Sequence, residues 1–283
     1  MKLLVDGGST KADWIAIDDN GKVLFTTQTL GLNPEVLDKE DVIARLEDKF
    51  DISHNRDKVK NLFFYGAGCG TDRMKDYLAE IFQNYFPNAI VAVYEDTYAA
   101  VYATTPKDEQ AIVCILGTGS NCSFFDGQVL HQKVQSLGYI VMDDGSGNHF
   151  GRLLIRGYFF NKMPKELAAE LQEEYNLDAD YVKANLYKEA NPNAYLATFA
   201  KFIIKHKEHP YCKKIIYKEL KKFVKNYIMQ YENYQSVPVH FVGSIAFYLK
   251  EELEEILSKY DIKIGNVLRR PIDGLIAYHI LNK

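Results

Sequence analysis

The fold is decided by two stretches of sequence that share one pattern: LLVDGGSTKADWIAIDDNG at residues 3–21 and VCILGTGSNCSFFDG at residues 113–127. In each stretch, a short apolar run ends at a glycine-rich turn, a second apolar run follows, and an Asn-Gly or Asp-Gly turn closes it. We interpret them as an internal duplication of one strand–turn–strand unit. When Gly7 is aligned with Gly117, the strands and turns of the two stretches coincide. Two unrelated glycine turns would explain each hairpin separately, but not this shared register.

The remaining elements predict an α/β protein, because strand-like and helix-like segments alternate through the first half of the chain. Apolar runs at residues 23–25, 61–65 and 90–94 predict further strands. A later apolar strand at residues 239–242 is followed by a predicted helix at residues 245–260.

Helix starts are indicated by capping residues. Asn33 followed by Pro34 predicts a helix start, because asparagine is a good N-cap and proline suits the first helical position. Thr71 is expected to cap a second helix, and Asp96 stands at the start of a third.

Residues 104–110, TTPKDEQ, are polar, contain a proline and lack periodicity. They are the best candidate for a domain boundary. Beyond the second hairpin, residues 151–234 have the pattern of helices almost throughout, which predicts a helical region within the second domain.

The charge balance argues against a nucleic-acid partner. Lysine and arginine total 34 residues against 38 for aspartate and glutamate, so the 283-residue chain carries a formal net charge of −4. Such a chain has no summed positive field to attract phosphate backbones.

The apolar runs are too short for a membrane span, and Asp6 interrupts the first of them too early for a secretory signal. We therefore expect no membrane association and a cytoplasmic location. The four cysteines are scattered, without a C-x-x-C pair, and are expected to be buried and reduced: Cys69, Cys114, Cys122 and Cys212.

The glycine turns favour anion binding. A turn between two antiparallel strands differs from the strand–turn–helix of Walker and Rossmann loops, and neither motif occurs in suitable context. The turns offer backbone N–H groups beside the hydroxyl groups of Ser9, Thr10, Thr118 and Ser120. Two such turns would suit a polyphosphate.

Three motifs together resemble a known superfamily. VDGGSTK at residues 5–11, GTGSN at 117–121 and VGS at 242–244 occur in the order of the two phosphate motifs and the adenosine motif of the actin-like ATPases. GTGSNC followed by DDGSG at residues 143–147 resembles the N-acetylglucosamine kinase branch, which is grouped with the BadF/BadG/BcrA/BcrD ATPases.

This resemblance implies a two-domain actin-like ATPase fold of the ribonuclease H-like type, with duplicated β-hairpin phosphate loops. The first domain would span residues 1–106 and the second residues 107–271, with the helical region inserted in the second. The final helix, residues 272–283, would return to the first domain.

The resemblance also implies binding of ATP and Mg²⁺. Asp6 would orient the Mg²⁺ through water, and a cation is expected there because a bare carboxylate would repel the phosphates. The alternative role of Asp6 is that of a turn-former. The residues implied in ATP binding are Asp6, Gly8, Ser9, Thr10, Lys11, Gly117, Thr118, Gly119, Gly243 and Ser244.

Asp96 matches the family's catalytic base, which takes the proton of the attacking sugar hydroxyl. From the residues alone, a helix N-cap is the more common role of an aspartate in this position, and only the resemblance favours the base. Carboxylate and amide side chains suit sugar hydroxyl groups, which both donate and accept hydrogen bonds. The sugar-binding residues implied are Asn33, Asp96, Ser120, Asn121, Ser136, Leu137, Gly138 and Asp143.

The chain departs from the family pattern at two positions. Met142 stands where the family has glycine before its acidic pair, and Leu137 stands where animal members have tryptophan. We expect these changes to affect the shape of the sugar pocket.

The expected activity is ATP-dependent phosphorylation of the 6-hydroxyl of N-acetylglucosamine or a related amino sugar. One alternative is a BadF-type ATPase that activates a partner dehydratase or reductase through an iron–sulfur cluster, for which Cys69 is in a loop-like setting. Another is a catalytically inactive sugar-binding regulator. A tyrosine-rich stripe at residues 217–231 suits either helix packing or the subunit surface of a homodimer.

Overall fold

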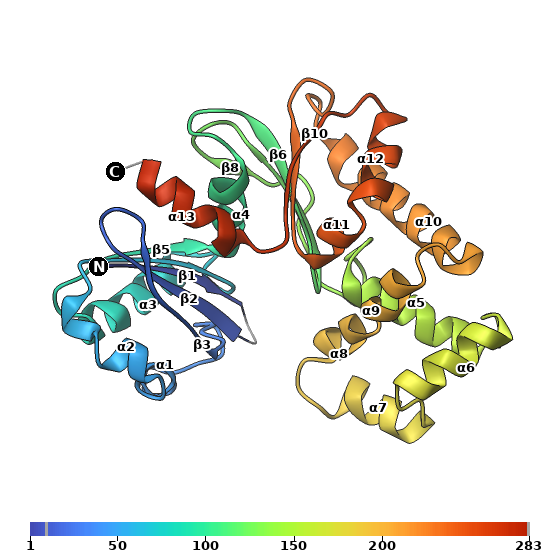
Figure 1. The fold of residues 1–283 in the computed structure, drawn as a ribbon, viewed down its shortest axis with the longest axis horizontal. Helices are drawn as coiled ribbons and strands as arrows, with labels where there is room; N and C mark the ends of the chain where they lie inside the picture. The colour runs from blue at the N-terminus through green and yellow to red at the C-terminus, as the bar shows by residue number, and fades with distance from the viewer. Residues whose placement is uncertain (9–10, 282–283) are drawn as a thin grey trace. The chain divides into compact units, whose positions relative to one another are not determined.

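The computed structural model describes residues 1–8 and 11–281, and it divides into two compact units (Figure 1). Unit 1 comprises residues 1–107 and 270–283, and unit 2 comprises residues 108–269.

Unit 1 contains a five-stranded sheet in the order β3-β2-β1-β4-β5. β1 pairs antiparallel with β2 and parallel with β4, and β4 pairs parallel with β5. The carboxyl ends of the three parallel strands therefore meet at one edge of the sheet. The strands are β1 Lys2–Gly7, β2 Lys11–Ile17, β3 Val23–Leu30, β4 Asn61–Gly66 and β5 Ile90–Glu95.

Helices cover both faces of this sheet, because alternate strand residues point to opposite sides. Val5 and Trp14 pack on one side, in a core that α1 and α3 complete, whereas Leu4 and Ile15 pack on the other side against α4 and α13. The helices are α1 Lys39–Glu47, α2 Phe50–Ser53, α3 Asp72–Tyr85, α4 Asp96–Thr104 and α13 Pro271–Leu281, with a 3₁₀ turn at Arg56–Lys58.

The predicted helix start at Asn33 is wrong. Asn33 Oδ1 accepts a hydrogen bond from the N–H of Glu35, which closes an Asx turn, and α1 begins only at Lys39. Asp38 is the N-cap and accepts from the N–H of Asp41. At this position, the asparagine side chain forms a local turn and does not cap a helix. The cap at Thr71, in contrast, is confirmed by its bond from the N–H of Met74.

Unit 2 repeats the strand arrangement of unit 1. Its sheet has the order β10-β9-β6-β7-β8, in which β6 and β7 form the antiparallel hairpin and β6, β9 and β10 run parallel. The predicted duplication is therefore confirmed, since each hairpin occupies the same place in its own sheet. The strands are β6 Ala111–Leu116, β7 Ser120–Phe125, β8 Leu130–His131, β9 Val239–Val242 and β10 Ile264–Leu268.

The predicted helical region lies between β8 and β9. Its large buried aromatic residues, among them Phe150, Phe199 and Phe223, share one core with Phe241 of β9. The helices there are α5 Gly147–Phe159, α6 Lys165–Glu174, α7 Ala179–Tyr187, α8 Pro192–Thr198, α9 Ala200–Lys205, α10 Pro210–Asn226 and a 3₁₀ turn at Ile228–Gln230.

The single helix expected over residues 245–260 is two helices, α11 Ser244–Tyr248 and α12 Lys250–Ser258. The break falls at Leu249, whose side chain is fully buried. The helix is thus interrupted at the residue whose side chain is buried in the core.

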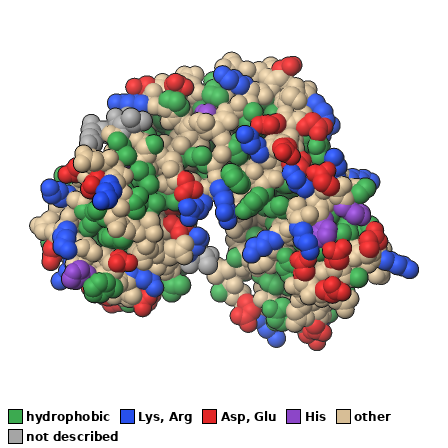
Figure 2. Space-filling view, viewed as in Figure 1, with side chains coloured by type: hydrophobic (Ala, Val, Ile, Leu, Met, Phe, Trp, Pro, Cys, Tyr) green, Lys and Arg blue, Asp and Glu red, His purple; other side chains and the backbone are tan. Residues whose placement is uncertain are grey.

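The surface carries charges of both signs, interspersed over the face drawn in Figure 2. Within the described residues, no helix combines the length and the apolarity that crossing a bilayer demands.

We predict that Gly274→Ala lowers the melting temperature, although alanine favours helix formation by about 1 kcal/mol. A Cβ at Gly274 of α13 would lie 2.5 Å from the carbonyl oxygen of Ala103 in α4, so the two helices must separate. Thermal unfolding followed by circular dichroism measures the change.

Gly70→Ala is the matched control, because a Cβ there meets nothing within 4 Å. Equal melting temperatures for the two variants would show that α13 does not depend on this close approach.

Candidate functional site

Two carboxylates predicted from the sequence lie at the same edge of the unit 1 sheet. Asp6 is near the end of β1, and Asp96 directly follows β5 as the first residue of α4. Strand register places these positions close together, because Gly7 pairs with Gly66 and Gly66 pairs with Glu95. The N-cap of α4 is Glu95, and Asp96 is the first residue of the helix.

The environment of both carboxylates disfavours their charge. Burial raises the pKa of Asp6 to about 7, and repulsion from Asp13 and Asp96 adds to the shift. Burial likewise raises the pKa of Asp96 to about 6, with a smaller contribution from Glu95. Acidic groups held in this way are typical of sites that bind a cation or accept a proton.

The sequence analysis missed Asp13 as a member of this cluster. Asp13 lies two residues after Lys11 on β2, and its Oδ2 is 2.9 Å from the Lys11 ammonium nitrogen. Gln28 on the neighbouring strand β3 donates a second hydrogen bond to it. Strand alternation puts Lys11 and Asp13 on one face, and this spacing was the available signal.

A cavity of about 490 Å³ lies within unit 2, at the turn between β6 and β7. Gly117 and Thr118 line it together with Ser244, so the GTGSN and VGS motifs, which are predicted to bind phosphate and adenosine, meet there. The lining is completed by Gly147, Ala197, Ala200, Lys201, Ile204, Lys205, Ile245, Tyr248 and Arg269.

The first turn of α5 holds the β6–β7 turn in place. The N–H of Gly147 donates to the carbonyl oxygen of Gly117 at 2.8 Å, and that of Asn148 donates to Thr118 at 3.0 Å. The carbonyl oxygens of Gly117 and Thr118 thus accept hydrogen bonds from α5. Without these bonds, they would repel an anion placed in the turn. Gly119 packs directly on Asp143, since a Cβ there would be 2.9 Å from a carboxylate oxygen.

Gly243 allows the VGS motif to lie close to the end of β6. Its φ is +121°, and a Cβ on it would lie 2.3 Å from the carbonyl oxygen of Leu116 at the end of β6. Only glycine allows this backbone conformation and this approach together.

Positive groups from parts of the chain without a motif line the same cavity. Lys201 and Lys205 come from α9, and the Arg269 guanidinium lies 5.5 Å from the ring centroid of Tyr248. Sequence reasoning missed these residues, because nothing in the α8–α9 segment indicates that it lies against the hairpin.

The predicted sugar residues of unit 2 are placed in two groups. Asp143 is buried, and its carboxylate accepts hydrogen bonds from the N–H of Ser120 and from the Asn148 side chain. Ser136 and Leu137, which are exposed, and Gly138, which is half-buried, form a segment that precedes it.

Asn121 Oδ1 accepts a hydrogen bond from the side chain of Gln132. In unit 1, Asn33 lies against Gly68, with its Oδ1 2.0 Å from the point that a Cβ of this glycine would occupy. The N–H of Gly8 donates to the carbonyl oxygen of Lys11, which closes the first glycine turn. The predicted phosphate contacts Ser9 and Thr10 lie outside the described residues.

All four cysteines are free and buried, as the sequence predicted. Cys114 and Cys122 face each other across the β6–β7 hairpin with their sulfur atoms 3.5 Å apart.

Paired sheets with matching hairpins, a glycine-bounded cavity and strand-end carboxylates define the two-domain actin-like ATPase fold, as expected from the sequence. A model of the BadF/BadG/BcrA/BcrD ATPase family matches residues 5–272. The chain belongs to this family.

Solved structures with the same fold include sugar kinases. A candidate N-acetylglucosamine kinase from Porphyromonas gingivalis is 34% identical, with 100% of this chain and 99% of that chain covered and a TM-score of 0.93. Another candidate N-acetylglucosamine kinase, from Chromobacterium violaceum, is 14% identical, with 98% of each chain covered and a TM-score of 0.69. A ROK family glucokinase from Streptomyces griseus, in complex with glucose and AMPPNP, is 14% identical, with 99% and 98% covered and a TM-score of 0.64.

We predict that Gly243→Ala weakens binding of an ATP analogue by at least about tenfold, because the β9–α11 turn must move away from β6. Isothermal titration calorimetry with AMPPNP measures the affinity, and thermal unfolding monitors the fold.

Gly117→Ala serves as the control for stability, since a Cβ there meets nothing within 4 Å. If Gly243→Ala bound AMPPNP as tightly as the native chain and melted at the same temperature, the close approach would be unimportant.

Proposed function

We propose that this protein is an ATP-dependent kinase that phosphorylates the 6-hydroxyl of N-acetylglucosamine or a closely related amino sugar. The observation that carries the proposal is full-length similarity, at 34% identity, to the candidate N-acetylglucosamine kinase from Porphyromonas gingivalis. The carboxylates of unit 1 and the cavity of unit 2 support it, because phosphoryl transfer depends mainly on positioning and charge neutralisation.

In this proposal, the cavity of unit 2 holds ATP. Backbone groups of the turn at Gly117 and Thr118 would bind phosphate, and Lys201 would add positive charge. Tyr248 and Arg269 both line the cavity and each offers a flat group, which suits the adenine ring.

Mg²⁺ fits the position of Asp6. The pKa of its carboxyl is raised by burial and by neighbouring acids, and none of the described residues donates a hydrogen bond to it. A hydrated cation would relieve this repulsion, and when bound it would neutralise charge on the polyphosphate.

Asp96 would act as the base that takes the proton of the sugar hydroxyl. Its pKa of about 6 leaves it mostly ionised at neutral pH while keeping it a stronger base than an exposed aspartate. The backbone N–H groups of Thr97 and of Asp96 itself hold the carboxylate at the start of α4.

The iron–sulfur alternative requires surface cysteines, and the burial of all four cysteines weighs against it. An inactive regulator would not need the ionisable base that Asp96 provides, and turnover by the native protein distinguishes it from a kinase.

We predict sugar-stimulated release of ADP when the native protein is incubated with ATP, Mg²⁺ and N-acetylglucosamine. A coupled assay over a panel of hexosamines measures it, and product analysis identifies the 6-phosphate. The absence of stimulation by any sugar in the panel would refute the proposal.

Asp96→Asn should lower kcat by at least about 100-fold with little change in the KM for ATP, because the amide cannot accept the proton. For the native protein, kcat should fall as the pH drops below about 6, where Asp96 becomes protonated. Asp76→Asn, at an exposed aspartate of α3, is the control and should retain activity. A normal rate in Asp96→Asn would remove Asp96 from the mechanism.

Asp6→Asn should raise the melting temperature at pH 8 in EDTA. Because the pKa of Asp6 is raised from 3.8 to about 7 on folding, its contribution to stability is lost as the pH rises through this range. The variant should therefore gain stability at pH 8 and gain little near pH 4.

Mg²⁺ should raise the melting temperature of the native protein at pH 8 but not that of Asp6→Asn. Differential scanning fluorimetry measures both effects. Equal stabilisation of the two proteins by Mg²⁺ would place the cation elsewhere.

A further inference from the structure

The segment at residues 137–142, here called the 137–142 loop, folds back on itself before Asp143. The N–H of Met142 donates to the carbonyl oxygen of Gly138 at 3.0 Å, and the N–H of Leu137 lies 3.2 Å from the Met142 sulfur. The Met142 side chain packs against the core of unit 2. Met142 thus connects the two ends of the loop and anchors them to the core of unit 2.

Tyr139 and Met142 pack against the core of unit 2, whereas the other apolar side chains of this loop are mostly exposed. Leu137, Ile140 and Val141 are 68%, 72% and 67% exposed. Hydrogen bonds must therefore provide much of what keeps the loop in one conformation.

Arg152 of α5 supplies these hydrogen bonds. Its Nη1 donates to the carbonyl oxygens of Tyr139 and Ile140, each at 3.1 Å. Its Nη2 lies 3.0 Å from Nδ1 of His149. A single guanidinium group therefore joins the loop to the first turns of α5.

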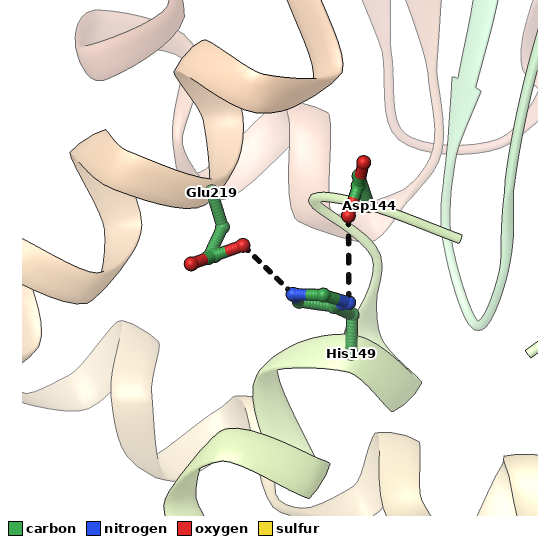
Figure 3. A group of neighbouring side chains, drawn as sticks. All are labelled: Asp144, His149 and Glu219. Atoms are coloured by element: carbon green, nitrogen blue, oxygen red, sulfur yellow. Dashed lines mark hydrogen bonds and ion pairs between the residues drawn. The ribbon is translucent and has the colours of Figure 1, made fainter. Parts of the chain in front are cut away.

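His149 orients Arg152. Since arginine only donates hydrogen bonds, His149 Nδ1 must accept, and the ring proton belongs on Nε2. Nε2 is 2.9 Å from Oε2 of Glu219 in α10, and this pair is drawn in Figure 3. Both side chains are buried, so an imidazole with a fixed tautomer links α10 to Arg152.

Asp144, His149 and Glu219 together resemble a set of metal ligands, but their other partners oppose that role. Arg152 lies at His149 Nδ1, and the Lys222 ammonium is 2.8 Å from Glu219. These two cations already occupy the positions from which a metal ion would be bound.

We propose that Arg152, oriented by His149 and Glu219, is a positioning residue that fixes the 137–142 loop for sugar binding. The loop carries Leu137 and Gly138 and leads into Asp143, so this inference rests on the proposed function. Arg152 would act through the loop backbone, without touching the sugar.

Arg152→Lys is the decisive variant, because lysine keeps the charge but has a single nitrogen, which cannot occupy the positions of both Nη1 and Nη2. Hydrogen–deuterium exchange of the loop amides should accelerate by about tenfold or more. The KM for the sugar should rise by a similar factor, whereas the KM for ATP should stay within about twofold.

Arg156→Lys is the matched control. Arg156 lies one turn further along α5, with its guanidinium over the ring of Phe160, and none of the described contacts joins it to the loop. It should leave both KM values and the exchange rates unchanged.

Two variants of His149 test whether its hydrogen bonds to Glu219 and Arg152 orient Arg152. Glutamine can accept from Arg152 and donate to Glu219, so His149→Gln should retain most of the sugar affinity. His149→Phe can do neither, and should behave like Arg152→Lys.

Unchanged exchange and unchanged sugar KM in Arg152→Lys would overturn the inference. A parallel rise in both KM values with a lower melting temperature would also overturn it, because the role would then be structural. If the native protein phosphorylates no sugar, the proposed function fails, while the exchange measurement still decides whether Arg152 holds the loop.

Discussion

The concentration of negative charge at the carboxyl edge of the unit 1 sheet is the constraint on which the rest of that unit depends. Parallel pairing of β1, β4 and β5 brings Asp6 and Asp96 to one edge, where burial makes their charges costly. Two cations, Lys11 and Arg270, reduce this cost. Arg270 directly precedes α13, so the packing of that helix also sets the electrostatics of the carboxylates.

In unit 2, the proposed anion site is formed mainly by uncharged backbone groups. The N-terminal turn of α5 engages the carbonyl oxygens of Gly117 and Thr118, and Gly243 allows the next strand end to approach them. The same helix carries Arg152 and His149 further along. One helix therefore supports both the glycine turn and the 137–142 loop.

Much of this arrangement could be predicted from local sequence. The repeated hairpins, the cap at Thr71 and the glycine before Ser244 depend on residues close together in the chain. The sugar-binding roles of Asn33 and Asp143 stay predictions, because they depend on partners that are distant in the sequence. Asn33 forms its own turn, and Asp143 uses its carboxylate on Ser120 and Asn148. The α9 lysines and the His149–Glu219 pair come together only through helix packing, which no local pattern encodes.

The division of unit 1 between two separated parts of the chain affects the order of its biogenesis. Unit 2 is continuous from residue 108 to residue 269, and it emerges from the ribosome before α13 is made. Until then, the sheet face containing Leu4 and Ile15 lacks the covering that Leu275 later provides. A nascent chain paused in unit 2 would therefore expose the part of this apolar face that α4 does not cover, and chaperones could bind it.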